Sequence, residues 1–509
     1  MKIVAYAISD STFDFQSIIK KIDLNLIKNH IEVLTSLPNK NEPSRFTGSL
    51  GFFMAVEYIK DELIKYGYSP VEEPFSLTVP LDEGAEIIVL DNDGNAIRTI
   101  KAYTLIPNTV NPSVTSRDGL EGHLIYGGTS QLFELTGKDL RDSIILVDYN
   151  CKWYWKNAVM LGAKAIIFIE PSDTTQVESI GKSLGIPAPV PRVYVRQEDG
   201  LWLKNLVISS NDSFRIKLKS RMRWDNIIVP NIIAIKEGTL SPQESIVVAC
   251  HYDSYSVVPA IAPGATDAID VATVLELARL LSEPTFAPIR TVMFAFLSGH
   301  GQGLSGAREF VDRHFYEIGS TIQLFLGIDL SYDSPYLGIY AKGSVYSYKT
   351  SVEGRRFPWV NDKVMNSYVP KISQQMGKTY SVLSAMFPVE PVSDPNPMIF
   401  DADPFTLAGG IGLTFHTTNA LRTRENTPLD KPEFINYERL HPQIEVVVGS
   451  IYGFSQEPAL LVTSSPERIA ADGGFATIEG YVGLYNFTTA WYDPFKHKDS
   501  IVHVQWPLA

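Results

Sequence analysis

Imidazole and carboxylate side chains stand directly after apolar, strand-like runs at several points in this chain of 509 residues. In an open α/β sheet the carboxyl ends of the strands form the ligand crevice, so these side chains are expected to converge on one spot. Nitrogen donors together with carboxylate oxygens are the ligands of a zinc-type ion. The sequence therefore predicts a metal site whose candidate ligands are His251, Asp267, Asp329 and His416.

A further carboxylate lies two residues after the first of these histidines. Asp253 is placed so that it could accept the ring N–H of His251 and fix the orientation of the imidazole, a common arrangement beside metal-binding histidines. Capping of a turn is the alternative role for Asp253.

A glycine-rich loop, Ser-Gly-His-Gly-Gln-Gly over residues 298–303, follows another apolar run. Its glycines suggest a phosphate-binding loop, but the Lys-Ser/Thr ending of that motif is missing, which argues against a P-loop. Gly299 and Gly301 would let the ring of His300 move towards a metal ion. An imidazole in this place can act as a base or as a ligand, and the sequence leaves both roles open.

Two arginines follow the last candidate ligand closely. Arg422 and Arg424 could bind the carboxylate of a substrate, since guanidinium groups recognise carboxylates in a bidentate manner. The alternative is that they are ordinary surface residues.

The patterns around these side chains divide the chain into four regions. Residues 1–83 carry apolar residues at helical spacing, and residues 84–225 are mostly strand-like. Residues 226–455 alternate strands with helices, which implies a central sheet covered by helices, and residues 456–509 are rich in strands again. The predicted fold is α/β: a mixed central sheet flanked by helices, with an inserted β-rich domain and a β-rich C-terminal segment.

The candidate residues resemble, in their order, the co-catalytic zinc aminopeptidase family, which also contains glutamate carboxypeptidase II and transferrin receptor. The region 84–225 looks like the protease-associated domain that is inserted in larger members. The motifs that carry the resemblance are His251-x-Asp253, Gly264-Ala265-Thr266-Asp267, residues 290–306, Asp329, His416-Thr417, the lead-in at residues 230–234 and the approach at residues 403–411.

The resemblance implies a pair of zinc ions. One ion would be held by His251, Asp267 and Asp329. The other would share Asp267 and be completed by a glutamate and His416, while a neighbouring glutamate would act as general base on the bridging water.

The glutamate pair that the family uses is replaced in this chain. His300 stands at the position of the general base, Gly301 stands at the position of the ligand glutamate, and Ala268 follows the bridging aspartate where the family usually has Asn or Asp. A glycine offers no donor atom, so one zinc ion is favoured over two, with none as a further alternative.

Two functions of different classes follow from this pattern. The first is a metal-dependent exopeptidase-type hydrolase, with His300 as substitute base and a peptide or an amino-acid-derived small molecule as substrate. The second is a non-catalytic pseudoenzyme that serves as a binding or assembly module, as in transferrin receptor. Cyclase or other amide chemistry on the same scaffold, as in glutaminyl cyclases, is a third class.

The composition limits the partners and the location. The formal net charge of −13 argues against nucleic-acid binding, which needs a basic face. No apolar run approaches the ~20 residues of a membrane span. The N-terminal apolar stretch is too short for a secretory signal, so a cytoplasmic location is expected. The resemblance leaves a homodimer open, because larger relatives often dimerise.

Overall fold

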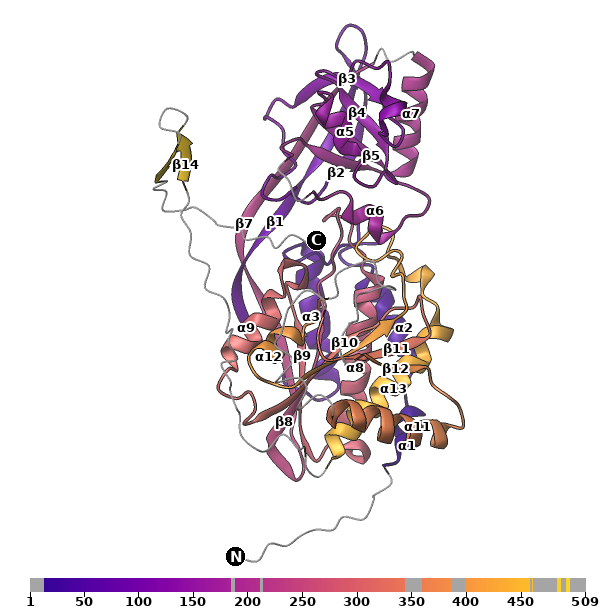
Figure 1. Ribbon diagram of the computed structural model, residues 1–509, viewed down its shortest axis with the longest axis vertical. Helices are drawn as coiled ribbons and strands as arrows, with labels where there is room; N and C mark the ends of the chain where they lie inside the picture. The colour runs from indigo at the N-terminus through magenta and orange to yellow at the C-terminus, as the bar shows by residue number, and fades with distance from the viewer. Residues whose placement is uncertain are drawn as a thin grey trace, which may run out of the picture.

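A large mixed sheet runs through the whole molecule (Figure 1). The computed structural model describes residues 13–184, 188–210, 214–343, 359–385, 399–457, 460, 483–486 and 491–494. Within these residues the strand order of the main sheet is β1-β2-β6-β5-β4-β3-β7-β9-β8-β10-β13-β11-β12, and β1 also pairs with β7.

The strands of this sheet differ greatly in length, from four residues to twenty-two. Their bounds are β1 Val71–Leu90, β2 Ala96–Thr104, β3 Leu120–Tyr126, β4 Ile144–Asp148, β5 Ala165–Ile169, β6 Arg192–Val195, β7 Arg215–Lys236, β8 Ser241–His251, β9 Arg290–Leu297, β10 Ile322–Asp329, β11 Tyr336–Tyr340, β12 Val382–Ala385 and β13 Gly412–Thr418.

Helices cover both faces of the sheet, in two groups. Those of the lower part in Figure 1 are α1 Phe15–Ile19, α2 Leu24–Leu34, α3 Leu50–Lys65, α8 Ala265–Ser282, α9 Ser305–Arg313, α11 Val369–Met376, α12 Asp403–Leu407 and α13 Tyr437–Gln456, with the shorter turns η1 Pro284–Phe286, η2 His300–Gln302, η3 Lys363–Tyr368 and η4 Pro432–Phe434. Those of the upper part are α4 Leu132–Leu135, α5 Trp155–Met160, α6 Gln176–Ile180 and α7 Gln197–Ser210.

The period-2 alternation of β8 shows how the lower part is layered. Ile246 and Val248 pack into the core formed with α2, α3, α8 and α13. Val247 and Ala249 point the other way and pack with α9 and α12. Because both faces are covered, the part of β8 from Ile246 to Cys250 is apolar throughout, as expected for a buried parallel strand. The predicted α/β fold with a mixed central sheet flanked by helices is confirmed.

Strands β1 and β7 connect the two parts of the molecule. They pair antiparallel from Val71 and Ile233 at one end to Leu90 and Arg215 at the other, and continue from the lower part into the upper part (Figure 1). The predicted domain boundaries at residues 84 and 226 lie inside these two strands. The upper part has its own core, which includes residues of β3, β4, β5 and α7.

The start of the described chain forms two short helices, and an antiparallel strand pair lies near its end. The helical spacing predicted within residues 1–83 corresponds at its start to two helices, α1 and α2, because Asp23 accepts hydrogen bonds from Asn25 and Leu26 and begins a new helix. Within residues 456–509 the structure describes an antiparallel pair, β14 Gly483–Asn486 and β15 Trp491–Pro494. Most of the predicted β-rich segment lies outside the described residues.

Among the described helices, none is both long and apolar enough to cross a membrane.

Candidate metal centre

The carboxyl ends of neighbouring parallel strands bring the predicted residues to one edge of the sheet. Asp329, the last residue of β10, is in register with His416 of β13. Ala249 of β8 is in register with Gly327 of β10, so His251 at the end of β8 lies level with Asp329. Residues 251, 329 and 416 are therefore aligned by strand pairing alone, as the sequence predicts for a sheet-edge site.

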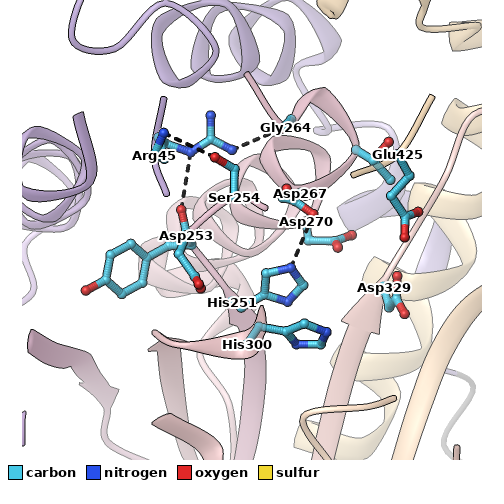
Figure 2. Close-up of polar contacts among 12 residues, drawn as sticks. Arg45, His251, Asp253, Ser254, Gly264, Asp267, Asp270, His300, Asp329 and Glu425 are labelled. Atoms are coloured by element: carbon cyan, nitrogen blue, oxygen red, sulfur yellow. Dashed lines mark hydrogen bonds and ion pairs between the residues drawn. The ribbon is translucent and has the colours of Figure 1, made fainter. Parts of the chain in front are cut away.

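His251 lies between two carboxylates. Its Nε2 is 3.3 Å from Oδ1 of Asp267, in the first turn of α8, and Figure 2 shows the ring pointing towards that turn. Its Nδ1 is 3.2 Å from Oδ2 of Asp401, which lies two residues before the start of α12. Burial alone would lower the pKa of His251, but the two carboxylates together raise it well above its ordinary value.

His300 joins the same group from the other side. Its ring stacks on the ring of His251 with centroids 3.9 Å apart, and its Nδ1 lies 3.1 Å from Oδ1 of Asp401 (Figure 2 shows the two rings). One donor atom from each of His251, His300 and Asp401 lies within 4.8 Å of the others. Burial would raise the pKa of Asp401, but the two imidazoles hold it below its usual range.

Asp329 and His416 are also in contact with each other, and the guanidinium of Arg422 contacts both of them. His416 Nδ1 lies 3.0 Å from Oδ2 of Asp329. Arg422 Nη1 donates to Oδ1 of Asp329 at 2.7 Å and to Oε2 of Glu425 at 2.8 Å, and its Nη2 lies 2.9 Å from Nδ1 of His416. Arg422 therefore contacts two carboxylates of the chain itself, and its predicted contact with a substrate carboxylate stays a prediction.

The positive charge of Arg422 lies among several buried or largely buried carboxyl groups, and these differ in pKa. Burial opposes ionisation of Asp329, yet Arg422 and then His416 bring the pKa of Asp329 far below its usual value. Burial raises the pKa of Glu425 despite Arg422, and burial together with Asp329 raises that of Asp270 well above its usual value. Arg422 itself adopts a left-handed backbone conformation, with φ of 44°. Such a conformation costs ~1–3 kcal/mol and persists where surrounding contacts fix it.

A buried arginine holds the turn that presents Asp267. Arg45 is fully buried and donates to the backbone oxygens of Pro263 at 2.7 Å and Gly264 at 2.9 Å (Figure 2). Gly264 has φ of 56°, and a Cβ on it would lie 2.5 Å from Oδ2 of Asp267. The glycine is therefore needed both for the turn and for the close approach of the carboxylate.

The start of α8 is capped by a carboxylic acid with an unusual pKa. Asp430 accepts hydrogen bonds from the backbone N–H of Thr266 and from its hydroxyl, both at 3.1 Å. Burial, with a further contribution from Asp267, raises the pKa of Asp430 to about 8.

Two other predicted residues have partners away from the metal-type cluster. Asp253 accepts a hydrogen bond from the Thr47 hydroxyl at 2.7 Å, whereas the ring nitrogens of His251 face Asp267 and Asp401. Arg424 donates to both oxygens of Asp173, at 3.0 and 2.9 Å, in the upper part. The predicted roles of Asp253 beside the imidazole and of Arg424 at a substrate stay predictions.

The space beside Gly301 is filled by an aromatic ring. A Cβ built on Gly301 would lie 2.6 Å from Cδ2 of Tyr255, closer than real side chains approach. Gly301 therefore offers no ligand atom. The Tyr255 ring also occupies the space that the Cβ of any other residue at this position would need.

The upper part of the molecule lies over the arginine side of the site. The backbone N–H of Gln176 in α6 donates to the carbonyl oxygen of Thr423 at 2.6 Å, and its side chain donates to Glu425 at 3.2 Å. With the pair Arg424–Asp173, these contacts tie the loop after β13 to the upper part.

Sequence reasoning missed Asp401, Glu425, Asp270, Asp430 and Arg45. Asp401 had one signal, because it stands two residues before the Asp403-Pro404-Phe405 approach that contributed to the resemblance. The others stand in loops or inside α8, where no spacing distinguishes them from ordinary polar residues.

The donor set suits one metal ion better than two. Two imidazoles and one carboxylate within 4.8 Å are a common ligand set for zinc, so the group His251, His300 and Asp401 fits a single ion. The pair implied by the resemblance fits poorly. Arg422 already binds Asp329 and contacts His416, and Gly301 offers no ligand atom.

The fold, a mixed sheet flanked by helices, is similar to that of a solved zinc aminopeptidase. Residues 231–449 match Peptidase family M28. The structure is similar to a zinc aminopeptidase from Bacillus subtilis, BSAP, with a TM-score of 0.54 and 20% identity over 87% of this chain and 98% of that one. It is also similar to a Peptidase M28 precursor from Shewanella amazonensis, with a TM-score of 0.55 and 15% identity over 87% and 96% of the two chains.

Curated relatives show the same likeness in sequence. The chain is 25% identical over 320 residues to a probable lipoprotein aminopeptidase, LpqL, from Mycobacterium tuberculosis, covering 61% of this chain and 59% of the relative. It is 22% identical over 327 residues to an aminopeptidase from Pseudomonas aeruginosa, covering 60% of this chain and 57% of the relative. The chain thus matches less than two thirds of the length of these relatives.

Proposed function

We propose that this protein is a metal-dependent hydrolase of the aminopeptidase type, which cleaves an amide bond at the end of a peptide or in an amino-acid-derived small molecule. The observation that carries the proposal is the meeting of His251, His300, Asp267 and Asp401 at the carboxyl edge of the sheet. The match of residues 231–449 to Peptidase family M28, and the aminopeptidases among the relatives, support the same chemistry.

The side chains of the site have separable tasks in this reaction. A bound zinc ion would supply Lewis-acid chemistry and lower the pKa of a water molecule. His251 and Asp401 are held in place by burial, whereas the His300 side chain is 23% exposed. The Asp267 carboxylate orients the His251 ring by accepting from Nε2.

The predicted role of His300 as substitute base and a role as metal ligand exclude one another at the same nitrogen atom. A nitrogen bound to a metal ion has no free lone pair with which to take a proton. In the role of base, the His300 ring would be oriented by Asp401, because Nδ1 of His300 faces that carboxylate and leaves Nε2 to take the proton.

The upper part of the molecule would restrict access to chain ends. The contacts of Gln176 with Thr423 and Glu425 place α6 beside the loop that carries Arg422. A roof of this kind favours short substrates over the interior of a folded chain. The predicted protease-associated identity of residues 84–225 remains a proposal.

A panel of amino-acid anilides and dipeptides tests the hydrolase. The purified protein should release the N-terminal residue when zinc is present and stop when a chelator removes it. N-acetylated versions of the same substrates are the matched control for exopeptidase action. Absence of turnover across the panel, with zinc bound and the fold intact, would contradict the proposal.

One specific observation favours the second predicted class, a non-catalytic binding module. Arg422 neutralises Asp329 and contacts His416, so two of the four predicted ligands are engaged by the chain itself. A pseudoenzyme would bind a peptide without hydrolysing it. Calorimetry would measure whether the protein binds a dipeptide. Binding without any product after long incubation would distinguish a pseudoenzyme from a slow hydrolase.

A further inference from the structure

We propose that this chain binds one divalent transition-metal ion through His251, His300 and Asp401, and that Arg422 takes the place of a second ion beside Asp329 and His416. The inference rests on the proposed function only in expecting a metal ion. It differs from the resemblance in the ligands, because neither His300 nor Asp401 belongs to the ligand set that the resemblance implies.

The geometry of the three donors suits a single ion. The Nδ1 atoms of His251 and His300 lie 3.2 and 3.1 Å from the two oxygens of Asp401. Metal bonds of ~2.0–2.2 Å at tetrahedral angles place neighbouring donor atoms ~3.3 Å apart, so the group needs little movement to close around an ion. The stacked rings bring both imidazoles to the same side of the carboxylate.

Each donor is held by a different element. His251 ends β8, His300 begins η2, and Asp401 lies two residues before α12. His251 and Asp401 are buried, with 8% and 7% of their surface exposed. The partial exposure of His300 leaves one side of the group open, which is a feature of catalytic rather than structural zinc sites.

A supporting carboxylate is also in place. If His251 binds the ion through Nδ1, its Nε2–H can donate to Asp267 at 3.3 Å. A histidine ligand whose second nitrogen donates to a carboxylate is the usual arrangement in metal sites, and it fixes the ring orientation. Asp267 then acts as a positioning residue for His251.

The other side of the site is closed to a cation. The guanidinium of Arg422 contacts both Asp329 and His416, so a second ion would meet a fixed positive charge at these ligands. Gly301 contributes no donor atom, and Tyr255 fills the adjoining space. The positive charge that a second ion would bring is thereby provided by the chain itself.

Zinc binding by matched variants separates this site from the arrangement that the resemblance implies. The metal-free protein is titrated with Zn²⁺ alone by calorimetry, and bound zinc is counted by elemental analysis after gel filtration. Wild type should bind one equivalent. His300→Gln and Asp401→Asn should weaken binding by more than about tenfold, because each removes a ligand.

His416→Gln and Asp329→Asn are the matched controls from the other side of the site, and they should keep the affinity within about threefold. Far-UV circular dichroism and thermal melting check that every variant is folded. His300→Glu restores a donor atom, so it should recover binding, and its Co²⁺ absorption spectrum should differ from that of wild type.

The opposite pattern would overturn the assignment. If Asp329→Asn abolishes binding while His300→Gln and Asp401→Asn keep it, the ion lies in the place that the resemblance implies. Two equivalents in wild type, or none, would also overturn it. These measurements use no substrate, so a protein that binds zinc as proposed but shows no turnover contradicts the proposed function alone.

Discussion

The two sides of the site use the same kinds of side chain for opposite purposes. On one side, two imidazoles and Asp401 face one another, and among the residues that the structure describes no Lys or Arg side chain forms an ion pair with Asp401. On the other side, Asp329, Glu425 and His416 surround the guanidinium of Arg422. The first arrangement is suited to take up a cation, whereas the second already contains one.

The difference shows why a residue inventory alone does not locate a metal ion. His416 and Asp329 are good zinc ligands by type, and they are in contact, but their charge is already balanced. Three kinds of substitution test this difference between the two sides of the site: removal of Arg422, a change of side-chain volume at Gly301, and a change of the ionisable group near Asp267.

The largest effect is expected from removing the internal cation. Arg422→Ala should lower the free energy of unfolding by about 3–5 kcal/mol in the presence of a chelator, because Asp329 and Glu425 lose the partner of a buried ion pair. Urea unfolding measures this change. Added Zn²⁺ should restore stability to the variant and raise its zinc content to two equivalents.

The contrasting result would be a variant that remains as stable as wild type and binds no more zinc. In that case Arg422 would not stand in for an ion, and the difference between the two sides of the site would have another cause.

A smaller effect concerns the carboxylic acid at the start of α8. With a pKa of about 8 in the folded protein, Asp430 binds its proton more tightly than in the unfolded chain, where a pKa of about 3.9 is expected. Its contribution to stability is therefore largest at low pH and is lost as the pH rises through 8. Asp430→Asn removes this dependence.

Between pH 5 and pH 8, wild type should lose up to about 4 kcal/mol more stability than Asp430→Asn, since each unit of pKa difference corresponds to about 1.4 kcal/mol. Urea unfolding at several pH values measures the difference. Parallel pH profiles for the two proteins would show that Asp430 ionises normally in the fold.

The closed space at Gly301 predicts a steric effect of moderate size. Gly301→Ala should cost about 1–3 kcal/mol, because its Cβ would lie 2.6 Å from Tyr255. Combining it with Tyr255→Ala should make the two changes less costly together than their sum. A double-mutant cycle on the free energy of unfolding gives the coupling, and additive costs would be incompatible with a clash.

The smallest effect is expected at the neighbouring arginine. Arg424 pairs with Asp173, whose side chain is 57% exposed, and lies 3.9 Å from the ring centroid of Phe434. Because surface ion pairs contribute little, Arg424→Ala should cost no more than about 1 kcal/mol. A loss comparable with that of Arg422→Ala would remove the contrast between an arginine that pairs with two largely buried carboxylates and one that pairs with an exposed carboxylate.

The sequence could predict the positions that strand pairing controls. Buried parallel strands are continuous apolar runs, so His251 and Asp329 could be placed at strand ends and His416 two residues before the end of its strand, and the strand register brings them to one level. Gly264 also predicts the start of the helix that carries Asp267 in its first turn. The same regularity made the mixed α/β fold predictable.

The rest of the site depends on loops, whose paths have no period. Asp401 reaches His251 from 150 residues away, and Arg422 turns back onto Asp329 through a left-handed residue. Asp253 follows β8 after the strand has ended and accepts a hydrogen bond from Thr47, a contact that spacing in the sequence does not indicate. Charge balance within such a group becomes visible only when all its members are placed.

Anomalous diffraction from crystals of the zinc-loaded protein would locate the ion without any assumption about activity. We expect a single peak within bonding distance of His251, His300 and Asp401, with the Arg422 guanidinium still on Asp329. A peak between Asp267 and Asp329, or two peaks with Arg422 displaced, would contradict this assignment of the ligands.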